Sequence, residues 1–273
     1  MSRRPAGPSL PLVFDSPHSG CDYPDDFGHA VPVELLRRAE DAFVDELIES
    51  APSHGATFLQ ALFPRSYIDP NRHEHEVDTG MLGEPWPHPV LPSEKAEMGL
   101  GLVRRLIKGN VDIYDRQLSV EEIRARIEGF HRPYLAELER LLDEAHECHG
   151  VAWHVNCHSM RSAGRRRGQR IPRADIVLGD RDGTSCERNF TAFVTEVVRG
   201  LGYRVVLNDP FKGAELVARF GRPDEARHSL QIEINRALYM DEDRIEKRPD
   251  FAAFKRDVDR LIAAVARYVR AEL

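Results

Sequence analysis

Two histidines follow runs of apolar, strand-like residues, and together they could bind a metal ion. The run LPLVF (10–14) leads into SPHSG and His18, and the run VAWHVNC (151–157) is followed directly by His158. In α/β sheets, ligands bind beyond the carboxyl ends of the strands, so both imidazoles lie where such a site would form. A hydrolytic zinc site uses three protein ligands and leaves one position open. The alternative for each histidine is a structural role, with its nitrogens satisfied by backbone hydrogen bonds.

Three carboxylates that follow His18 are candidates for the third ligand: Glu40, Asp41 and Asp45. The apolar spacing predicts a helix over 31–50. At about 100° per residue, Asp41 and Asp45 lie well away from its apolar stripe, and Glu40 lies beside it. A solvated acidic helix face is the plainer interpretation, and this geometry does not choose among the three. Apolar neighbours on the same side of the helix favour Asp41.

The segment PRSYIDPNR (64–72) indicates a site for a carboxylate. Arg65 and Arg72 bracket a short predicted strand, and Asn71 precedes the second arginine. A planar guanidinium holds a carboxylate through two parallel hydrogen bonds, so an anionic substrate is expected here. The alternative is an Arg65–Asp69 ion pair at the surface, which would contribute little stability.

Glu233 lies between two isoleucines in a predicted strand, SLQIEIN (229–235). Its side chain therefore shares a face with those of Gln231 and Asn235. Burying an unpaired carboxylate is costly, which favours a functional role. Beside a metal ion, Glu233 would act as a general base and then as a general acid towards the leaving amine. The alternative is a solvent-facing residue on an edge strand.

Other features carry weaker signals. HEHE (73–76) looks like a metal-binding tract but is typical of a solvated loop. GRRRGQR (164–170) is a basic loop that could attract an acidic substrate or be simply exposed. The four cysteines include no CxxC pair, which indicates free thiols, and Cys157 would point away from His158. The absence of a GxSxG motif argues against a serine enzyme of the α/β-hydrolase type.

The elements that would position these residues alternate between strands and helices. Strands are predicted at 10–14, 56–63, 66–69, 151–157, 174–179, 203–208 and 229–235, and helices at 31–50, 93–108, 119–147, 184–200 and 250–272. This alternation predicts an α/β fold in which a central, mixed and mostly parallel sheet is flanked by helices. The absence of a linker favours a single catalytic domain over 1–273. The segment 73–97 is expected to be a long functional loop.

The bulk composition is that of a globular protein, with 41% hydrophobic and 30% charged residues and a formal net charge of −7. That charge argues against nucleic acid as a partner. No apolar stretch approaches the ~20 residues of a membrane span. The N-terminal apolar run is short and broken by proline, unlike a signal peptide. A cytoplasmic protein is therefore expected, with no membrane partner.

Seven motifs occur in the order seen in the N-formylglutamate amidohydrolases, which the chain resembles between residues 12 and 242. They are SPHSG, EDAFVDEL, SYIDPNR, VNCHSM, DIVLGDRDGTSC, LNDPFKG and HSLQIEINRALYM. The resemblance implies a phosphorylase/hydrolase-like fold related to zinc carboxypeptidases and aspartoacylase-like deacylases, with one Zn²⁺ per chain. It also implies hydrolysis of N-formyl-L-glutamate to formate and L-glutamate, a reaction of histidine degradation.

The same resemblance implies roles for individual residues. His18, Asp41 and His158 would be the zinc ligands, and Glu233 would be the general base. Four residues would bind the substrate, a small acidic N-acyl amino acid: Arg65, Asn71, Arg72 and Lys212.

Two positions depart from the family's pattern. Asn156 stands where an aspartate is common; asparagine can orient His158 through its carbonyl oxygen, but more weakly. Pro70 lies within the DLNR-like motif and stiffens the approach to Asn71 and Arg72. Two alternatives to the implied reaction remain. One is a zinc deacylase or carboxypeptidase-like enzyme for another N-acyl amino acid or a small peptide, and the other is a catalytically inactive protein that binds acidic ligands.

Overall fold

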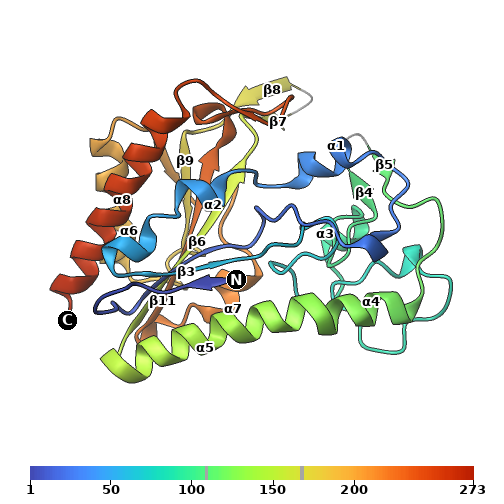
Figure 1. Ribbon diagram of the computed structural model, residues 1–273, viewed down its shortest axis with the longest axis horizontal. Coiled ribbons are helices and arrows are strands. Elements are labelled where there is room, and N and C mark those ends of the chain that lie inside the picture. Colours follow the sequence, from blue (N-terminus) through green and yellow to red (C-terminus); the bar gives the residue numbers. More distant parts are fainter. Residues whose placement is uncertain (108–109, 167–168) are drawn as a thin grey trace. The chain divides into compact units, whose positions relative to one another are not determined.

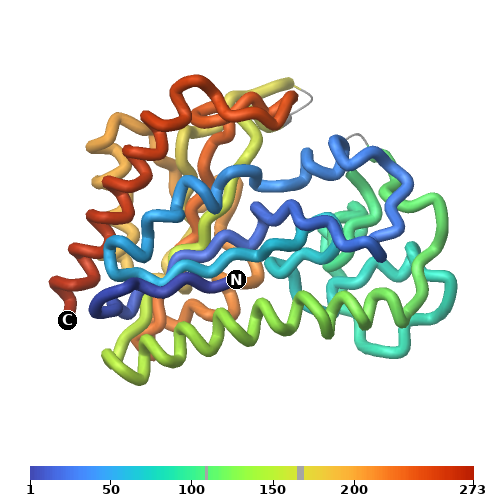
Figure 2. Tube along the Cα trace, in the orientation of Figure 1, coloured from blue at the N-terminus to red at the C-terminus, as the bar shows by residue number. Residues whose placement is uncertain are grey.

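The computed structural model describes residues 1–107, 110–166 and 169–273 (Figure 1). The described chain divides into two compact units. Unit 1 comprises Met1–Ser16, Phe43–Gln60 and Glu139–Leu273, and unit 2 comprises Pro17–Ala42 and Ala61–Leu138. The path of the chain, coloured along the sequence in Figure 2, shows that each unit is assembled from segments that are distant in the sequence.

Unit 1 is built on a seven-stranded sheet of order β1-β3-β2-β6-β11-β9-β10. Its strands are β1 (Ser2–Arg3), β2 (Leu12–Ser16), β3 (Thr57–Gln60), β6 (Ala152–Met160), β9 (Ile176–Gly179), β10 (Val205–Leu207) and β11 (Arg227–Asn235). The β1–β3 and β9–β11 pairs are antiparallel, and the other pairs are parallel. The predicted α/β fold class, with a mixed and mostly parallel sheet, is confirmed. Two small antiparallel ribbons accompany the sheet: β7 (Ala163–Arg166) with β8 (Gln169–Pro172), and β12 (Met240–Asp241) with β13 (Glu246–Lys247).

The two faces of the sheet differ in chemistry, because successive side chains of a strand point to opposite faces. On β6 one face carries Trp153, Val155 and Cys157, and the other carries His154, Asn156 and His158, all of them buried. Helices α2 (Val44–Leu47), α6 (Arg188–Gly200) and α8 (Phe251–Ala271) cover the apolar face (Figure 1). Helix α7 (Glu215–Phe220) packs on the polar face, where the ring of Phe220 meets His154 edge-on. Polar groups on this covered face must find partners within the protein.

Unit 2 has a hydrophobic core of its own, with the guanidinium of Arg126 in it. Its elements are α1 (Val33–Leu36), α3 (Glu94–Glu97), α4 (Val120–Arg126), the first part of α5 (Arg132–His149), and the ribbon of β4 (Leu106–Ile107) and β5 (Val111–Asp112). Arg126 donates hydrogen bonds to Tyr67 O (3.1 Å), Tyr114 Oη (2.7 Å) and Phe27 O (3.1 Å). The same guanidinium lies over the rings of these three residues. A buried cation is thus supplied with acceptors and aromatic faces on all sides.

A π-helical segment, Ile127–His131, joins α4 to α5. The predicted helix over 119–147 is therefore present, with one wider turn inside it. Helices α6 and α8 confirm the predictions for 184–200 and 250–272.

The predicted helix over 31–50 is wrong in its middle. After α1 and a 3₁₀ turn at Arg37–Ala39, the backbone is extended at Glu40 (φ −64°, ψ 149°), and Phe43 has a φ of 66°. The N–H of Asp41 donates to the carbonyl of His18 (2.9 Å) instead of to its own segment. Contact with a distant part of the chain thus overrides the local apolar period.

Two further element predictions are wrong. The segment predicted as a helix over 93–108 is helical only over α3 within its described residues 93–107, because Gly99 takes a φ of 69° and a Cβ at Gly101 would lie 2.5 Å from the Glu76 carbonyl oxygen. The segment 66–69 forms a turn and not a strand. The long loop over 73–97 is present, with only a 3₁₀ turn at Thr79–Met81 and α3 in it. Three more 3₁₀ turns in unit 1 lie at Ala51–His54, Pro223–Glu225 and Arg236–Leu238, and one in unit 2 at Asp25–Phe27.

None of the helices in the described residues is long and apolar enough to cross a membrane. All four cysteines are free thiols, as predicted; Cys21 and Cys148 are exposed, and Cys157 and Cys186 are buried.

A capping box formed by Ser119 and Glu122 stabilises the N-terminus of α4. Ser119 Oγ accepts from the N–H of Glu122 (3.1 Å), and the Glu122 carboxylate accepts from the N–H of Ser119 (2.8 Å). Ser119→Ala should lower the free energy of unfolding by about 1 kcal/mol, because the N–H of Glu122 loses its side-chain acceptor. Urea denaturation checks this, with Ser119→Thr as a control that keeps the hydroxyl. Equal losses in the two variants would mean that the hydroxyl does not cap the helix.

Candidate active site

The polar face of unit 1 contains a buried carboxylate with two hydrogen-bond donors. Asp15 on β2 pairs in register with Asn156 on β6. Its Oδ1 accepts from His154 Nε2 (2.9 Å) and from Asn156 Nδ2 (2.7 Å). All three residues are at most 1% exposed. A carboxylate is tolerated at this depth only where donors satisfy it, so these partners are what allows Asp15 to be buried.

This network determines which nitrogen of His158 can bind a ligand. Asn156 uses its Nδ2 as a donor to Asp15, so the atom that faces His158 Nε2 at 2.7 Å is the acceptor Oδ1. In the neutral imidazole, Nε2 must therefore carry the proton, and Nδ1 carries the lone pair. The contact through the asparagine carbonyl oxygen that we expect from the sequence is present.

Glu233 lies beside His158. The two residues are register partners on the parallel strands β6 and β11, so their side chains leave the same face of the sheet. β11 lies between β6 and β9, and Glu233 is only 8% exposed; the edge-strand alternative is therefore wrong. Gln231, on the same face, donates from Nε2 to Glu233 Oε1 (3.0 Å). A carboxylate held in this way next to an imidazole could accept and return a proton.

His18, in unit 2, has a carboxylate at each of its two ring nitrogens. Nε2 lies 2.6 Å from Asp69 Oδ1, and Nδ1 lies 3.3 Å from Asp41 Oδ2. Asp41 is held by the backbone of the same loop, since its N–H donates to His18 O and its carbonyl accepts from Ser19 Oγ (2.9 Å). Asp41 thus reaches His18 from an irregular segment and not from a helix face. Of the other two candidates, Glu40 accepts from Tyr23 Oη (2.6 Å), and Asp45 begins α2 in unit 1.

Asp69 is ionised and fixes the tautomer of His18. Burial by itself would raise the pKa of Asp69, but Arg65, His18 and Arg72 hold it well below its usual value. Its Oδ2 accepts from Nε and Nη2 of Arg65 (3.1 and 2.7 Å), and its Oδ1 accepts from His18 and from the N–H of Asn71 (3.0 Å). The Arg65–Asp69 pair exists, but it is buried, so the surface-pair alternative is wrong. In the neutral imidazole with its proton on Nε2, the lone pair of Nδ1 faces the Asp41 carboxylate, and a metal ion or a proton between them would relieve that contact.

The predicted substrate-binding residues differ in how many contacts hold their side chains. Arg72 donates from Nε to Leu100 O (3.3 Å) and from Nη1 to Asn71 O (2.8 Å), and its own carbonyl accepts from Nε2 of His131 (2.9 Å). Lys212 belongs to unit 1, where its exposed Nζ pairs with Asp182 (2.7 Å).

Residues 10–240 match the family model described as N-formylglutamate amidohydrolase. The chain belongs to the N-formylglutamate amidohydrolase family. A crystal structure of an N-formylglutamate amidohydrolase from Ralstonia eutropha is 45% identical to it, with a TM-score of 0.95 over 100% of this chain and 99% of that one.

Two curated proteins named N-formylglutamate deformylase, from Pseudomonas putida and Pseudomonas aeruginosa, are each 28% identical over 85% of this chain and 83% of their own length. A solved gene product of Agrobacterium tumefaciens has a TM-score of 0.62 at 17% identity, over 96% of this chain and 92% of that one, and shares the fold.

Four residues that contact the candidate site residues or lie near them are not identified from the sequence. They are Asp15, His154, Asp69 and Arg104. A signal exists for the first two, because Asp15 and His154 are polar residues inside otherwise apolar strands, where an unpaired group would be costly. Asp69 carries no such signal, since its burial depends on contacts with His18 and Arg65 that local spacing does not reveal.

Other features of the family member have local roles. In the HEHE tract, Glu74 pairs with Arg132 (3.1 Å), and Glu76 accepts from the N–H of His73 (3.0 Å) and from Ser93 Oγ (2.7 Å). Within the basic stretch 164–170, residues 164–166 belong to β7 and residues 169–170 to β8, which pair antiparallel; residues 167 and 168 lie outside the described residues.

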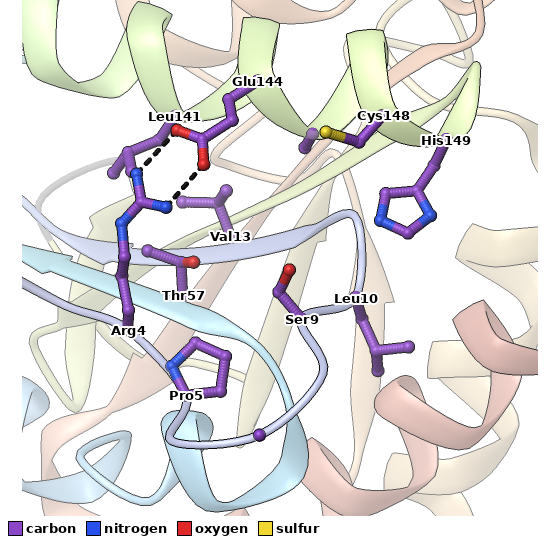
Figure 3. Close-up of a pocket in the computed structure, with 12 residues that line it drawn as sticks. Arg4, Pro5, Ser9, Leu10, Val13, Thr57, Leu141, Glu144, Cys148 and His149 are labelled. Atoms are coloured by element: carbon purple, nitrogen blue, oxygen red, sulfur yellow. Dashed lines mark hydrogen bonds and ion pairs between the residues drawn. The ribbon is translucent and has the colours of Figure 1, made fainter.

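A cavity of about 240 Å³ in unit 1 lies under α5. Figure 3 shows Arg4 reaching Glu144 across it through two hydrogen bonds of 2.5 and 2.6 Å. None of the predicted site residues lines this cavity.

The buried network around Asp15 generates a second prediction. Asp15→Asn keeps the size of the side chain but removes the charge to which His154 and Asn156 donate, so the free energy of unfolding should fall by about 3 kcal/mol. Asp259→Asn is the control, because Asp259 is a half-exposed carboxylate paired with His54 and should change the free energy of unfolding by less than about 1 kcal/mol. Urea denaturation of both variants gives the comparison. Losses of the same size would show that the buried network contributes no more than a surface pair.

Proposed function

We propose that the protein is a zinc-dependent amidohydrolase that cleaves N-formyl-L-glutamate to formate and L-glutamate. The two Pseudomonas relatives and the Ralstonia neighbour carry names for this activity, which supports the substrate. We further propose that both units of the chain work as one catalytic domain.

The register of Glu233 with His158 is the observation that carries this proposal. A protein that only bound an acidic ligand would have no use for a buried carboxylate next to an imidazole whose free nitrogen is a metal donor. Chain connectivity supports the participation of His18. Asp15 lies beside Asn156, and His18 follows Asp15 by three residues, a length of chain that spans at most about 10 Å.

The chain's own donors suit a catalytic zinc ion. We propose that the ligands are Nδ1 of His18, the Asp41 carboxylate and Nδ1 of His158, three buried groups. Asp69 and Asn156 would not bind the metal themselves. Asp69 would accept a hydrogen bond from Nε2 of His18, and Asn156 would accept one from Nε2 of His158. Such partners fix the ring orientation and strengthen a metal-ligating histidine. Two imidazoles and one carboxylate match the donor set of hydrolytic zinc sites.

In the proposed reaction, Glu233 transfers the proton, and the cationic and polar side chains near Asp69 bind the substrate. A zinc ion held by these residues supplies a Lewis acid for the formyl carbonyl. Glu233 takes a proton from the attacking water, whose oxygen bonds to the formyl carbon. Glu233 then returns the proton to the amide nitrogen as the C–N bond breaks, which gives formic acid and the amine; the acid proton passes to the amine or to solvent, which leaves formate. Asn71, Arg72 and Arg65 hold the carboxylate of the substrate and so orient the amide.

The role of Glu233 is tested by Glu233→Gln. The glutamine can still accept the hydrogen bond from Gln231, but it cannot take a proton, so kcat for formate release should fall about 10³-fold. Zinc content, measured by mass spectrometry, should stay near one per chain. Glu246→Gln, at an exposed glutamate of β13, is the control and should keep normal turnover. Loss of zinc from Glu233→Gln would mean that Glu233 is a ligand and not the base.

Metal removal tests the ligand set. Dialysis against a chelator should abolish formate release and lower the melting temperature, since a ligand that binds only the folded state stabilises it. Added zinc should restore both. His158→Ala should bind less than about a tenth of the zinc of the wild type, whereas His146→Ala, at a half-buried histidine of α5, should bind it normally. Full zinc binding by His158→Ala would exclude His158 as a ligand.

A further inference from the structure

Unit 2 carries more positive than negative charge around Asp69. Four cations interact with one another there: Arg65, Arg72, Arg104 and Lys95. The carboxylates that interact with them are those of Asp69, Asp41 and Glu94. Four cations against three carboxylates leave positive charge in excess in a place where Arg65 and Arg104 are mostly buried. Charges of one sign at this depth repel each other strongly, so the cluster calls for an anion.

Arg104 is the cation of this cluster that the protein satisfies least. Its side chain is 12% exposed, and its nearest carboxylate oxygen is Asp69 Oδ2, at 3.7 Å from Nη2. Within the part of the chain that the structure describes, its buried Nε has no hydrogen-bond partner. Burial, and then the neighbouring charge of Arg65, lowers the pKa of Arg104 to about 9. Burial, and then the neighbouring charges of Arg72 and Arg104, lowers the pKa of Lys95.

The other buried arginine of unit 2 shows what a structural guanidinium looks like. Arg126 donates three hydrogen bonds and lies over three aromatic rings. Arg104 has none of these hydrogen bonds among the described residues. Burying a guanidinium whose N–H groups make no hydrogen bonds costs folding free energy. We therefore expect these N–H groups to donate to a ligand.

We propose that Arg104, with Lys95 at its side, binds the second carboxylate of a dicarboxylate substrate. The inference rests on the proposed function and makes it more specific: Asn71 and Arg72 take one carboxylate, and Arg104 takes the other. Two separate cationic groups, at Arg72 and Arg104, suit the two carboxylates of a dianion such as an N-acyl glutamate. Arg104 thereby selects for acidic amino acids over those with neutral side chains.

Binding of simple carboxylates to the purified protein tests this proposal without turnover. Isothermal titration compares glutarate, which has two carboxylates, with pentanoate, which has the same chain length and one. Arg104→Met should weaken glutarate about 30-fold and pentanoate less than about 3-fold, as expected for the loss of one charge-assisted pair. Arg105→Met is the matched control, because the adjacent Arg105 pairs with Asp78 (2.8 Å), and it should leave both affinities unchanged.

Thermal unfolding separates a binding role from a structural one. If Arg104 awaits a ligand, Arg104→Met should keep or raise the melting temperature of the ligand-free protein, because an unsatisfied buried charge is removed. A clear fall, or failure to fold, would assign Arg104 to structure and overturn the proposal. Arg104→Lys, which keeps the charge, then provides a second check: it should retain part of the glutarate preference.

The remaining outcomes are decisive as well. Unchanged glutarate affinity in Arg104→Met, equal weakening of both acids, or no glutarate binding by the wild type would each overturn the proposal. Glutarate binding that depends on Arg104, in a protein that releases no formate, would sustain it while refuting the proposed reaction.

Discussion

The in-register parallel pairing of β2, β6 and β11 is the constraint on which the site in unit 1 depends. Because side chains alternate with period two, this register puts the polar residues of three strands on one face in matching rows. Asp15 then meets Asn156, and His158 meets Glu233. A shift of one residue in any of these strands would place its polar row on the apolar face and its apolar row on the polar face. The same requirement that keeps the core apolar therefore keeps the catalytic candidates together.

Buried carboxylates act in both units as acceptors that orient neutral donors. In unit 1, Asp15 fixes Asn156, which in turn fixes the ring of His158. In unit 2, Asp69 fixes His18 and is itself balanced by Arg65. Each histidine is thereby left with its lone pair on Nδ1. An aspartate at position 156 would place a negative charge in direct contact with His158. With Asn156 there, the nearest carboxylate of this network is that of Asp15, on the far side of the asparagine. The basicity of His158 is then tuned through a neutral relay instead of by direct contact with an anion.

The sheet could be predicted because its strands are apolar runs bounded by turns, and their burial on both faces follows from that pattern. The helices α6 and α8 could be predicted for the same reason. The break at Glu40–Phe43 could not, since it results from pairing between Asp41 and His18, residues far apart in the chain. The types and positions of His18, His158 and Glu233 in the sequence indicate a site. Asp41 is favoured by its apolar neighbours on a predicted helix, which is broken at that point, and by the family resemblance. Asp69 and Arg104 are invisible at that level, because what distinguishes them is burial and the neighbours that fold around them.

The π turn at Ile127–His131 bears on how this part of the chain can vary. His131 is fully buried and donates to the carbonyl of Arg72, so the backbone of Arg72 is tied to a helix. A π turn holds one residue more than an α turn, and such turns are common where a helix has to present a residue at a particular angle. Deleting one residue here would restore an ordinary helix and rotate His131 by roughly 100° relative to α4, away from Arg72. The segment can therefore exchange many of its side chains for others, but its length is fixed.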